Sequence, residues 1–429
     1  MTEAVNQYMA IFRKLIIVSS YLCAAYLILN SFKNESGDFG IYYQAAFGFR
    51  NGEIPYFFDA QSNNMYLNGP IFGILLIPFT YLSAVNALTA WRILTICLTV
   101  VLFRCLYKGH NQSILSILLP IFIIAFPWRN NFANTSLVII SLALLVFFYK
   151  WTLEGKQVHA AIVLCLALEL KPYIALPFLL FIFIDKNWQV IKYVFLYTLV
   201  MNVIYYVIWK TSYIDWLNSI FSRSGYWTKG DQSTIRTMLW KYLAVPESVA
   251  TLVGVFSYLL MILLVISRTH GKDLHGSGVY LYNRKFLACL TLAPLFPLYS
   301  HEQDYLFSLF GLIALMTFYK FYEFGIFVIV PGFFILNWSN ESLVAGLFFS
   351  VLMTVLYLMA AEIFSIKSTL ILFPLIIALT IAAIRILIDQ GSMEQFYFHN
   401  LLALLFGVST FILFIRSTFH IDRNQANRI

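Results

Sequence analysis

The sequence predicts an all-α polytopic membrane protein, and three observations lead to that fold class. Hydrophobic residues make up 61% of the 429 residues and charged residues only 11%, whereas a soluble domain has roughly 45–50% and 25%. The mean hydropathy is +0.79. The apolar residues are gathered into runs that approach the roughly 20 residues of a membrane-spanning helix. No soluble domain can be separated, because the longest polar stretch, 211–246, is shorter than an ordinary domain.

The apolar runs predict about 12 transmembrane helices. Several of them are shorter than an ideal span, so only their approximate limits are predicted. The runs lie near residues 12–32, 88–107, 113–127, 134–150, 190–209, 248–268, 286–299, 303–320, 324–338, 343–365, 368–388 and 398–416.

Two further apolar stretches predict short broken hairpins. The first, 70–83, is punctuated by proline and is too short to cross a bilayer comfortably. The second, 158–185, is interrupted by Glu169-Leu170-Lys171-Pro172. Because proline lacks a backbone donor and disfavours helix at the preceding residue, this stretch predicts two half-helices that meet at a polar turn within membrane depth. Irregular backbone at that depth is tolerated only where protein or a wet cavity surrounds it.

The lysines and arginines predict the orientation in the membrane. They are scattered among short loops, which favours the lipid bilayer as partner and argues against nucleic acid. If both hairpins return to their own side, most basic loops share the cytoplasmic face with both termini, as in a multi-pass protein of the inner (plasma) membrane. Two full crossings would instead place Arg104 and Lys108 outside, so hairpins are preferred. The extracytoplasmic side then receives 33–69, 128–133, 211–246, 300–303, 338–342 and 389–397.

Asp38 opens the first outer stretch, directly after the first apolar run, where a short juxtamembrane helix is expected. If that helix starts at Phe39, Asp38 is its N-cap, and Tyr42 and Tyr43 lie one turn on, within reach of the carboxylate. From this stretch alone, a helix cap and a functional carboxylate are equally good interpretations.

Glu169 and Lys171 are ionisable residues inside an apolar stretch. Such groups are costly in a membrane and usually mark a functional site, although a purely structural ion pair is the alternative. His301, Glu302 and Asp304 suggest a divalent cation but lack the HExxH spacing, so no metal and no cofactor is expected. Nucleotide-binding glycine motifs and a GxSxG elbow are absent from the sequence.

Several of these segments resemble motifs of the GT-C superfamily of polyprenyl-phosphate-sugar glycosyltransferases. The closest branch is glycosyltransferase family 87, a group of polyprenol-phosphate mannosyltransferases. One segment departs from the family pattern, since Ala133-Asn134-Thr135-Ser136 stands where glycine-glutamine is usual, which puts the role of Asn134 in doubt. The resemblance rests on Asp38 with Tyr42-Tyr43, Gly52 and Pro55-Tyr56, on Tyr66 to Pro70 with Pro78, on Leu170 to Tyr173, and on Ser300 to Tyr305.

This resemblance implies a GT-C-like fold, with a catalytic membrane module at 1–320 and C-terminal helices at 321–429 that complete the same membrane domain. It also implies transfer of a sugar, mannose or another hexose, from a polyprenyl-phosphate donor to a hydroxyl of a lipid- or glycan-linked acceptor, with inversion. Such a reaction needs a base for the hydroxyl proton and a cation for the departing phosphate. The implied roles are Asp38 as base, Lys171 with Arg129 or His301 at the phosphate, and Tyr42, Tyr43, Asn134 and Glu302 as further substrate-binding residues.

Two other classes of protein could carry the same features. A transporter or flippase of a lipid-linked saccharide would also need a basic, aromatic cavity, but transporters often show matched broken helices in two halves. Here both broken stretches precede residue 190, which favours the enzyme. A polysaccharide polymerase or ligase usually carries its large outer loop late in the chain, whereas the longest one here is mid-chain.

Overall fold

The computed structural model describes rather more than half of the chain, and every regular element in that part is a helix. No strand occurs among these residues, which confirms the all-α fold class. Four predicted spans, at 324–338, 343–365, 368–388 and 398–416, lie outside the described residues except for isolated positions. The described residues are 2–33, 37–53, 68–106, 119–120, 122–123, 126–210, 212, 214–216, 218, 234–269, 284–296, 302–311, 408 and 411–412.

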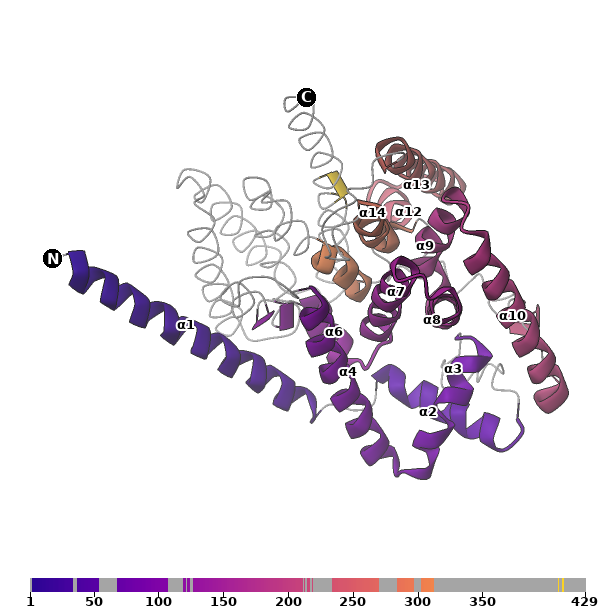
Figure 1. Cartoon of the computed structure of the whole chain (residues 1–429), viewed down its shortest axis with the longest axis horizontal. Helices are drawn as coiled ribbons and strands as arrows, with labels where there is room; N and C mark the ends of the chain where they lie inside the picture. Colours follow the sequence, from indigo (N-terminus) through magenta and orange to yellow (C-terminus); the bar gives the residue numbers. More distant parts are fainter. Residues whose placement is uncertain are drawn as a thin grey trace. The chain divides into compact units, whose positions relative to one another are not determined.

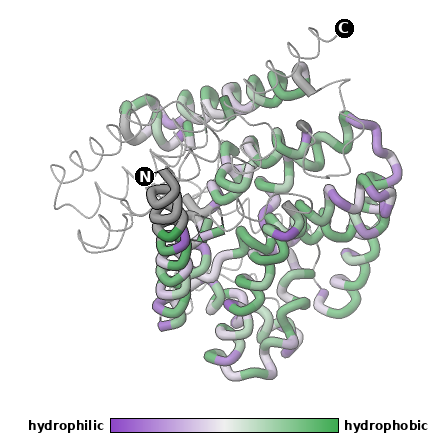
Figure 2. The backbone as a smooth tube through the Cα atoms, turned by 60° about the vertical axis from the view of Figure 1, so that its left-hand side comes forward, coloured by the Kyte–Doolittle hydropathy of each residue, from purple (hydrophilic) through white to green (hydrophobic). Residues whose placement is uncertain are grey.

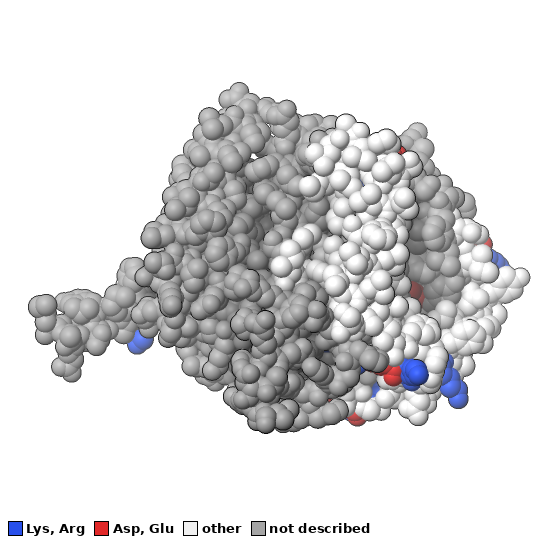
Figure 3. All heavy atoms as spheres, turned by 90° about the horizontal axis from the view of Figure 1, so that it is seen from above, with Lys and Arg blue, Asp and Glu red and all other residues white. Residues whose placement is uncertain are grey.

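Three described helices are long and apolar enough to cross a membrane. They are α4 (Ala84–Leu106), α10 (Trp188–Trp209) and α13 (Glu247–Thr269), and each covers a predicted span. Hydrophobic residues predominate along the described helices, while many of the hydrophilic residues lie at helix ends and turns (Figure 2). On the face drawn in Figure 3, few charged side chains interrupt the described surface. The count of about 12 spans rests largely on residues outside the described part and stays a prediction.

The remaining helices are shorter or only partly apolar, and the chain folds into two compact units. Unit 1 comprises residues 1–30, 103–130 and 230–429, and unit 2 comprises 31–102 and 131–229. These other elements are α1 (Thr2–Ser31), α2 (Gly37–Arg50), α3 (Pro70–Leu75), η1 (Ile77–Tyr81), α6 (Phe126–Ala133), α7 (Val138–Leu153), α8 (Gln157–Leu170), α9 (Pro172–Ile184), α12 (Ile235–Thr237), η3 (Met238–Tyr242), α14 (Arg284–Leu292), η5 (Ala293–Leu295) and η6 (Glu302–Tyr305).

The helix breaks occur where the prolines predict them. The stretch 70–83 forms the short helices α3 and η1, each with proline in its first turn. The stretch 158–185 forms α8 and α9, which meet at Lys171, a residue outside both helices with φ −146° and ψ 82°. Pro172 begins α9, because its missing N–H needs no partner at the first helical position. Whether each hairpin returns to its own side of the membrane stays a prediction.

Unit 2 is built on α8, which contacts α7, α9, α10 and α3. Figure 1 shows α7, α8 and α9 gathered together, with α2 and α3 adjacent to each other. Two side chains secure the end of α2. The Trp209 indole Nε1–H donates to the Phe49 carbonyl oxygen at 2.8 Å, and the Arg50 guanidinium donates to the Thr80 carbonyl oxygen at 3.1 Å.

An aromatic cluster joins α2, α3, η1 and α4 within unit 2. Trp91 is 2% exposed, and its ring centroid lies 5.4 Å from that of Phe39, 6.1 Å from Phe72 and 6.0 Å from Phe79. Aromatic pairs at such distances contribute about 0.5–1.5 kcal/mol each beyond the area they bury. The cluster therefore fixes the short helices that stand between the longer ones.

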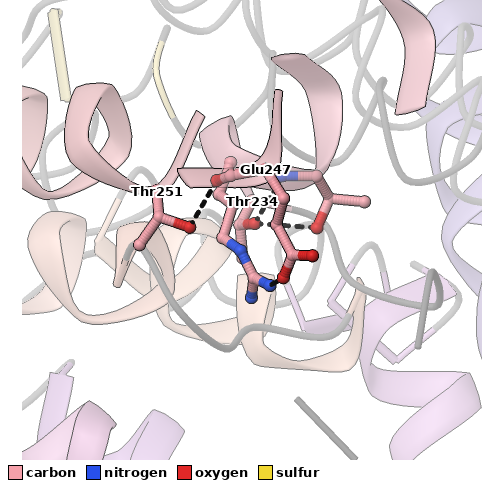
Figure 4. A network of polar contacts seen from close by, with 5 residues as sticks. Thr234, Glu247 and Thr251 are labelled. Atoms are coloured by element: carbon pink, nitrogen blue, oxygen red, sulfur yellow. Dashed lines mark hydrogen bonds and ion pairs between the residues drawn. The ribbon is translucent and has the colours of Figure 1, made fainter. Parts of the chain in front are cut away.

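In unit 1, a polar network secures the start of α13. The buried Arg236 guanidinium pairs with the Glu247 carboxylate in the first turn of that helix. Thr234 caps α12 by accepting a hydrogen bond from the Thr237 N–H at 3.1 Å, and Thr251 donates to the Glu247 carbonyl oxygen at 2.8 Å (Figure 4). Thr251 thus bonds back to the preceding turn of α13, while Arg236 and Glu247 fix how the chain enters that helix.

Candidate active site

The first turn of α2 is docked on the turn that joins α6 to α7. The Asp38 N–H donates to the Asn134 carbonyl oxygen at 2.9 Å, and the Phe39 N–H donates to Thr135 Oγ1 at 3.0 Å. These are two of the orphan donors at the start of the helix, which otherwise need a cap or water. Gly37 allows the helix to approach this turn closely, since a Cβ at position 37 would lie 2.5 Å from the Asn134 carbonyl oxygen.

This docking corrects the predicted start of the helix. Asp38 is not an N-cap ahead of Phe39, because α2 already begins at Gly37 and Asp38 lies in its first turn. The capping oxygens come instead from Asn134 and Thr135, far away in the sequence. A carboxylate in the first turn is still favoured by the positive end of the helix dipole.

Asn131 shapes the turn that receives α2. Its side chain is 0% exposed. The amide oxygen accepts a hydrogen bond from the Ile139 N–H at 3.3 Å, and the amide nitrogen donates to the Ser136 carbonyl oxygen at 3.2 Å. Thr135 has φ 56°, a left-handed conformation that the surrounding contacts must support. This role of Asn131 was not predicted from the sequence, because its hydrogen-bond partners depend on how the turn is folded.

Asn134 contributes its main chain to α2, while its side chain is exposed. The predicted contact of its amide with substrate is not tested by this arrangement and stays a prediction. A backbone contact also makes the departure from the family pattern at this position understandable, because any residue supplies a carbonyl oxygen.

The two tyrosines predicted to bind sugar differ in their surroundings. Tyr42 is 8% exposed, and its ring lies 5.5 Å from the Phe72 ring and 6.4 Å from the Trp91 ring. Tyr42 is therefore part of the aromatic cluster. Tyr43 is half-buried, and its hydroxyl donates to the Leu82 carbonyl oxygen at 3.0 Å. Contact of either residue with sugar stays a prediction.

Lys171 occupies the break between α8 and α9. It is 8% exposed, and its Nζ donates to the Tyr173 hydroxyl at 3.0 Å. As N-cap residue of α9, Lys171 lies at the positive end of a 13-residue helix. Anions are favoured at such an end, and a lysine adds a full charge to the same place.

Glu169, two residues before Lys171, is 3% exposed and faces α3. Its Oε2 accepts a hydrogen bond from the Ile71 N–H at 2.8 Å. The Asp38 helix and the lysine turn are thus connected through α3, since Phe72 of α3 also contacts Tyr42 of α2. Asp38 and Lys171 belong to one packed body, unit 2.

Comparison with known families identifies the chain at this point. The model of glycosyltransferase family 87 matches residues 66–296, which is more than half of the chain. The chain belongs to glycosyltransferase family 87. Membership confirms the predicted resemblance and makes the protein a membrane glycosyltransferase. A comparison with curated proteins found no significant match.

The segment matched to family 87 contains the lysine turn but not the aspartate helix. Glu169, Lys171 and the turn at Asn134 lie inside the match, whereas Asp38 precedes it. The assignment of Asp38 therefore depends on its own position, in a helix that the matched turn at 134–135 holds in place.

The described structure does not place three of the predicted substrate-binding residues, Arg129, His301 and Glu302, near Asp38 or Lys171. Arg129 lies in α6 and Glu302 begins η6, but their side chains are outside the described part, as is the whole of His301. All three belong to unit 1. Within the described residues, no three His, Cys, Asp or Glu side chains form a group that could hold a metal ion.

Replacing Gly37 with alanine is expected to destabilise the protein more than replacing Gly52. Both glycines have positive φ, 45° and 78°, so either substitution costs about 1–2 kcal/mol of backbone strain. At Gly52 the new Cβ meets no atom within 4 Å. At Gly37 it meets the Asn134 carbonyl, which adds roughly 1–3 kcal/mol of overpacking. Thermal unfolding midpoints in detergent would test this, and equal midpoints would contradict the docking.

Proposed function

We propose that this family 87 glycosyltransferase transfers a hexose, such as mannose, from a polyprenyl-phosphate donor to a hydroxyl of a lipid- or glycan-linked acceptor. The observation that carries the proposal is the buried Lys171 at the N-terminus of α9, within the segment matched to the family. A lysine there neutralises a phosphate strongly, because the surroundings have a low dielectric constant.

The proposed reaction inverts the anomeric carbon in one displacement. The Asp38 carboxylate takes the proton of the acceptor hydroxyl as the acceptor oxygen bonds to the anomeric carbon. The bond between that carbon and the phosphate oxygen breaks, and its electron pair leaves with the polyprenyl phosphate. Lys171 stabilises the charge that develops on the departing phosphate. No metal ion or other cofactor enters this proposal.

The packing of unit 2 supports separate roles for Asp38, as the base, and Lys171, as the cation that binds the phosphate. Asp38 is in the first turn of a helix whose start is tied to the turn at 134–135, and Lys171 is in a turn tied to α3. A base and a phosphate-binding cation are effective only when both are held in place, since misplacement by about 1 Å can cost 100-fold in rate. Tyr42 and Tyr43, together with Arg129, Asn134, His301 and Glu302, remain proposed substrate-binding residues.

The proposed reaction takes place on the extracytoplasmic side of the inner membrane, with both termini in the cytoplasm. This orientation follows from the basic loops, by the positive-inside rule. Asp38 follows the first apolar run, so an extracytoplasmic Asp38 requires a cytoplasmic N-terminus. The assay for the activity is transfer from radiolabelled polyprenyl-phosphate mannose, compared with other polyprenyl-phosphate hexoses, by membranes that contain the protein.

Lys171→Met is expected to weaken donor binding while the protein stays folded, because methionine fills a similar volume. A hydrogen bond to a charged group contributes about 1.5–3 kcal/mol, so the KM for the donor should rise at least about tenfold. Lys192→Met, which removes an exposed lysine of α10, serves as control. Loss of the folded protein, rather than of donor affinity, would favour a purely structural lysine.

Asp38→Asn is expected to lower kcat by about 100- to 10,000-fold, the usual contribution of a general base, and to leave donor binding nearly unchanged. Asparagine keeps the size of aspartate but does not accept the proton. Asp185→Asn, at an exposed position after α9, is the matched control. A variant with parental transfer activity would remove Asp38 from the chemistry. A protein that instead moves lipid-linked sugar across vesicles, whether or not Asp38 is present, would point to a transporter.

A further inference from the structure

We infer that Glu169 is a positioning residue, which clamps residues 68–71 onto the break between α8 and α9 and so holds Lys171 in its place. The inference rests on the proposed role of Lys171 in binding the donor. Three hydrogen bonds form the clamp. The Asn68 side-chain amide donates to the Leu170 carbonyl oxygen at 2.6 Å, the Gly69 N–H to the Glu169 carbonyl oxygen at 2.8 Å, and the Ile71 N–H to Glu169 Oε2 at 2.8 Å.

Gly69 makes this close contact sterically feasible. A Cβ built at this position would lie 2.5 Å from Glu169 Cγ and 2.6 Å from its Oε2. Real Cβ atoms do not approach other atoms so closely, so any larger residue would push the Glu169 side chain away from Ile71. Gly69 thus leaves room for the Glu169 carboxylate. Pro70 begins α3 and has no N–H that would need a partner.

The clamp explains how a carboxylate is accommodated inside an apolar stretch. Glu169 is 3% exposed, with one oxygen bonded to Ile71 and its stem covered by Gly69. A residue surrounded in this way by the protein main chain acts on its neighbours rather than on substrate. Its carboxylate also lies at the start of α3, where the positive end of a helix favours a negative charge.

Lys171 is the residue whose position the clamp controls. It is the single residue between two helices, and the residues on either side of it are constrained. Leu170 is held by Asn68 on one side, and Pro172 is fixed in φ on the other. The Tyr173 hydroxyl then orients the ammonium group itself. Without the clamp, the backbone of the break could shift, and the charge of Lys171 would move away from the donor phosphate.

The test compares two substitutions of Glu169 in the full-length protein. Glu169→Gln keeps an oxygen that accepts from the Ile71 N–H and should retain donor KM and kcat within a few-fold. Glu169→Leu removes the acceptor and should raise donor KM about tenfold, with a smaller change in kcat. Gly69→Ala should act in the same direction as Glu169→Leu. Gly48→Ala, where the new Cβ meets only ordinary contacts, is the matched control.

A double substitution tests whether Glu169 acts through Lys171. If it does, adding Glu169→Leu to Lys171→Met should raise donor KM no further than Lys171→Met alone. Independent, additive effects would overturn the inference, and so would parental KM in Glu169→Leu. A Glu169→Gln protein that folds but loses kcat as Asp38→Asn does would show that the carboxylate takes part in the chemistry, and would also overturn it.

Hydrogen exchange gives a measurement that does not depend on activity. The Ile71 amide should exchange slowly in the parent and in Glu169→Gln, and distinctly faster in Glu169→Leu, as followed in peptides covering 68–76. The Gly69 amide bonds to the main-chain carbonyl of residue 169 and should exchange slowly in the parent and in both variants. Fast exchange in the parent would overturn the clamp. If the parent transfers no sugar from any polyprenyl-phosphate donor, the proposed function fails, while slow exchange at Gly69 and Ile71 would still support the clamp.

Discussion

One constraint governs the described part of this protein: main-chain N–H and C=O groups at helix ends among apolar residues need hydrogen-bond partners. A buried N–H or C=O without a partner costs several kcal/mol where no water can reach it, and every helix break in this chain creates such groups. The Phe39 N–H uses the Thr135 hydroxyl, the Ile71 N–H uses the Glu169 carboxylate, and the Phe32 carbonyl, just past α1, uses the Arg92 guanidinium at 3.2 Å. This requirement accounts for the positions of these three polar side chains in unit 2.

These caps have a second effect, because each joins segments that are distant in sequence. Thr135 ties the turn before α7 to α2, Glu169 ties α8 to α3, and Arg92 ties α4 to Phe32. The aromatic cluster around Trp91 fills the space between the same elements. The proposed base, in α2, and the proposed phosphate-binding lysine, at the break between α8 and α9, are therefore both held by contacts with several segments.

The sequence predicts those features that depend on neighbouring residues, and misses those that depend on distant ones. Proline, together with the polar residues that precede it, predicts the breaks at 70 and 172, because its effect on the backbone is local. Pro177, which follows apolar residues, lies inside α9. The start of α2 was placed wrongly because its caps lie 96 residues away. Phe39, Tyr42 and Phe49 recur at helical spacing, a pattern that indicates a packed face and could have predicted the burial of Tyr42. Arg129, His301 and Glu302 belong to another part of the chain, and local pattern says nothing of their distance from Asp38.

The docking of α2 on the turn at 134–135 has a consequence for membrane insertion. The helix that carries Asp38 leaves the ribosome well before the residues that complete its first turn, because 96 positions separate Phe39 from Thr135. At about 5–20 residues per second, this interval lasts roughly 5–20 s. During that time neither capping oxygen is available to the Asp38 and Phe39 N–H groups, so α2 cannot dock until the turn at 134–135 has been made. The proposed base therefore reaches its final position only after its own helix has been synthesised, when α2 docks on a turn that is made 96 residues later.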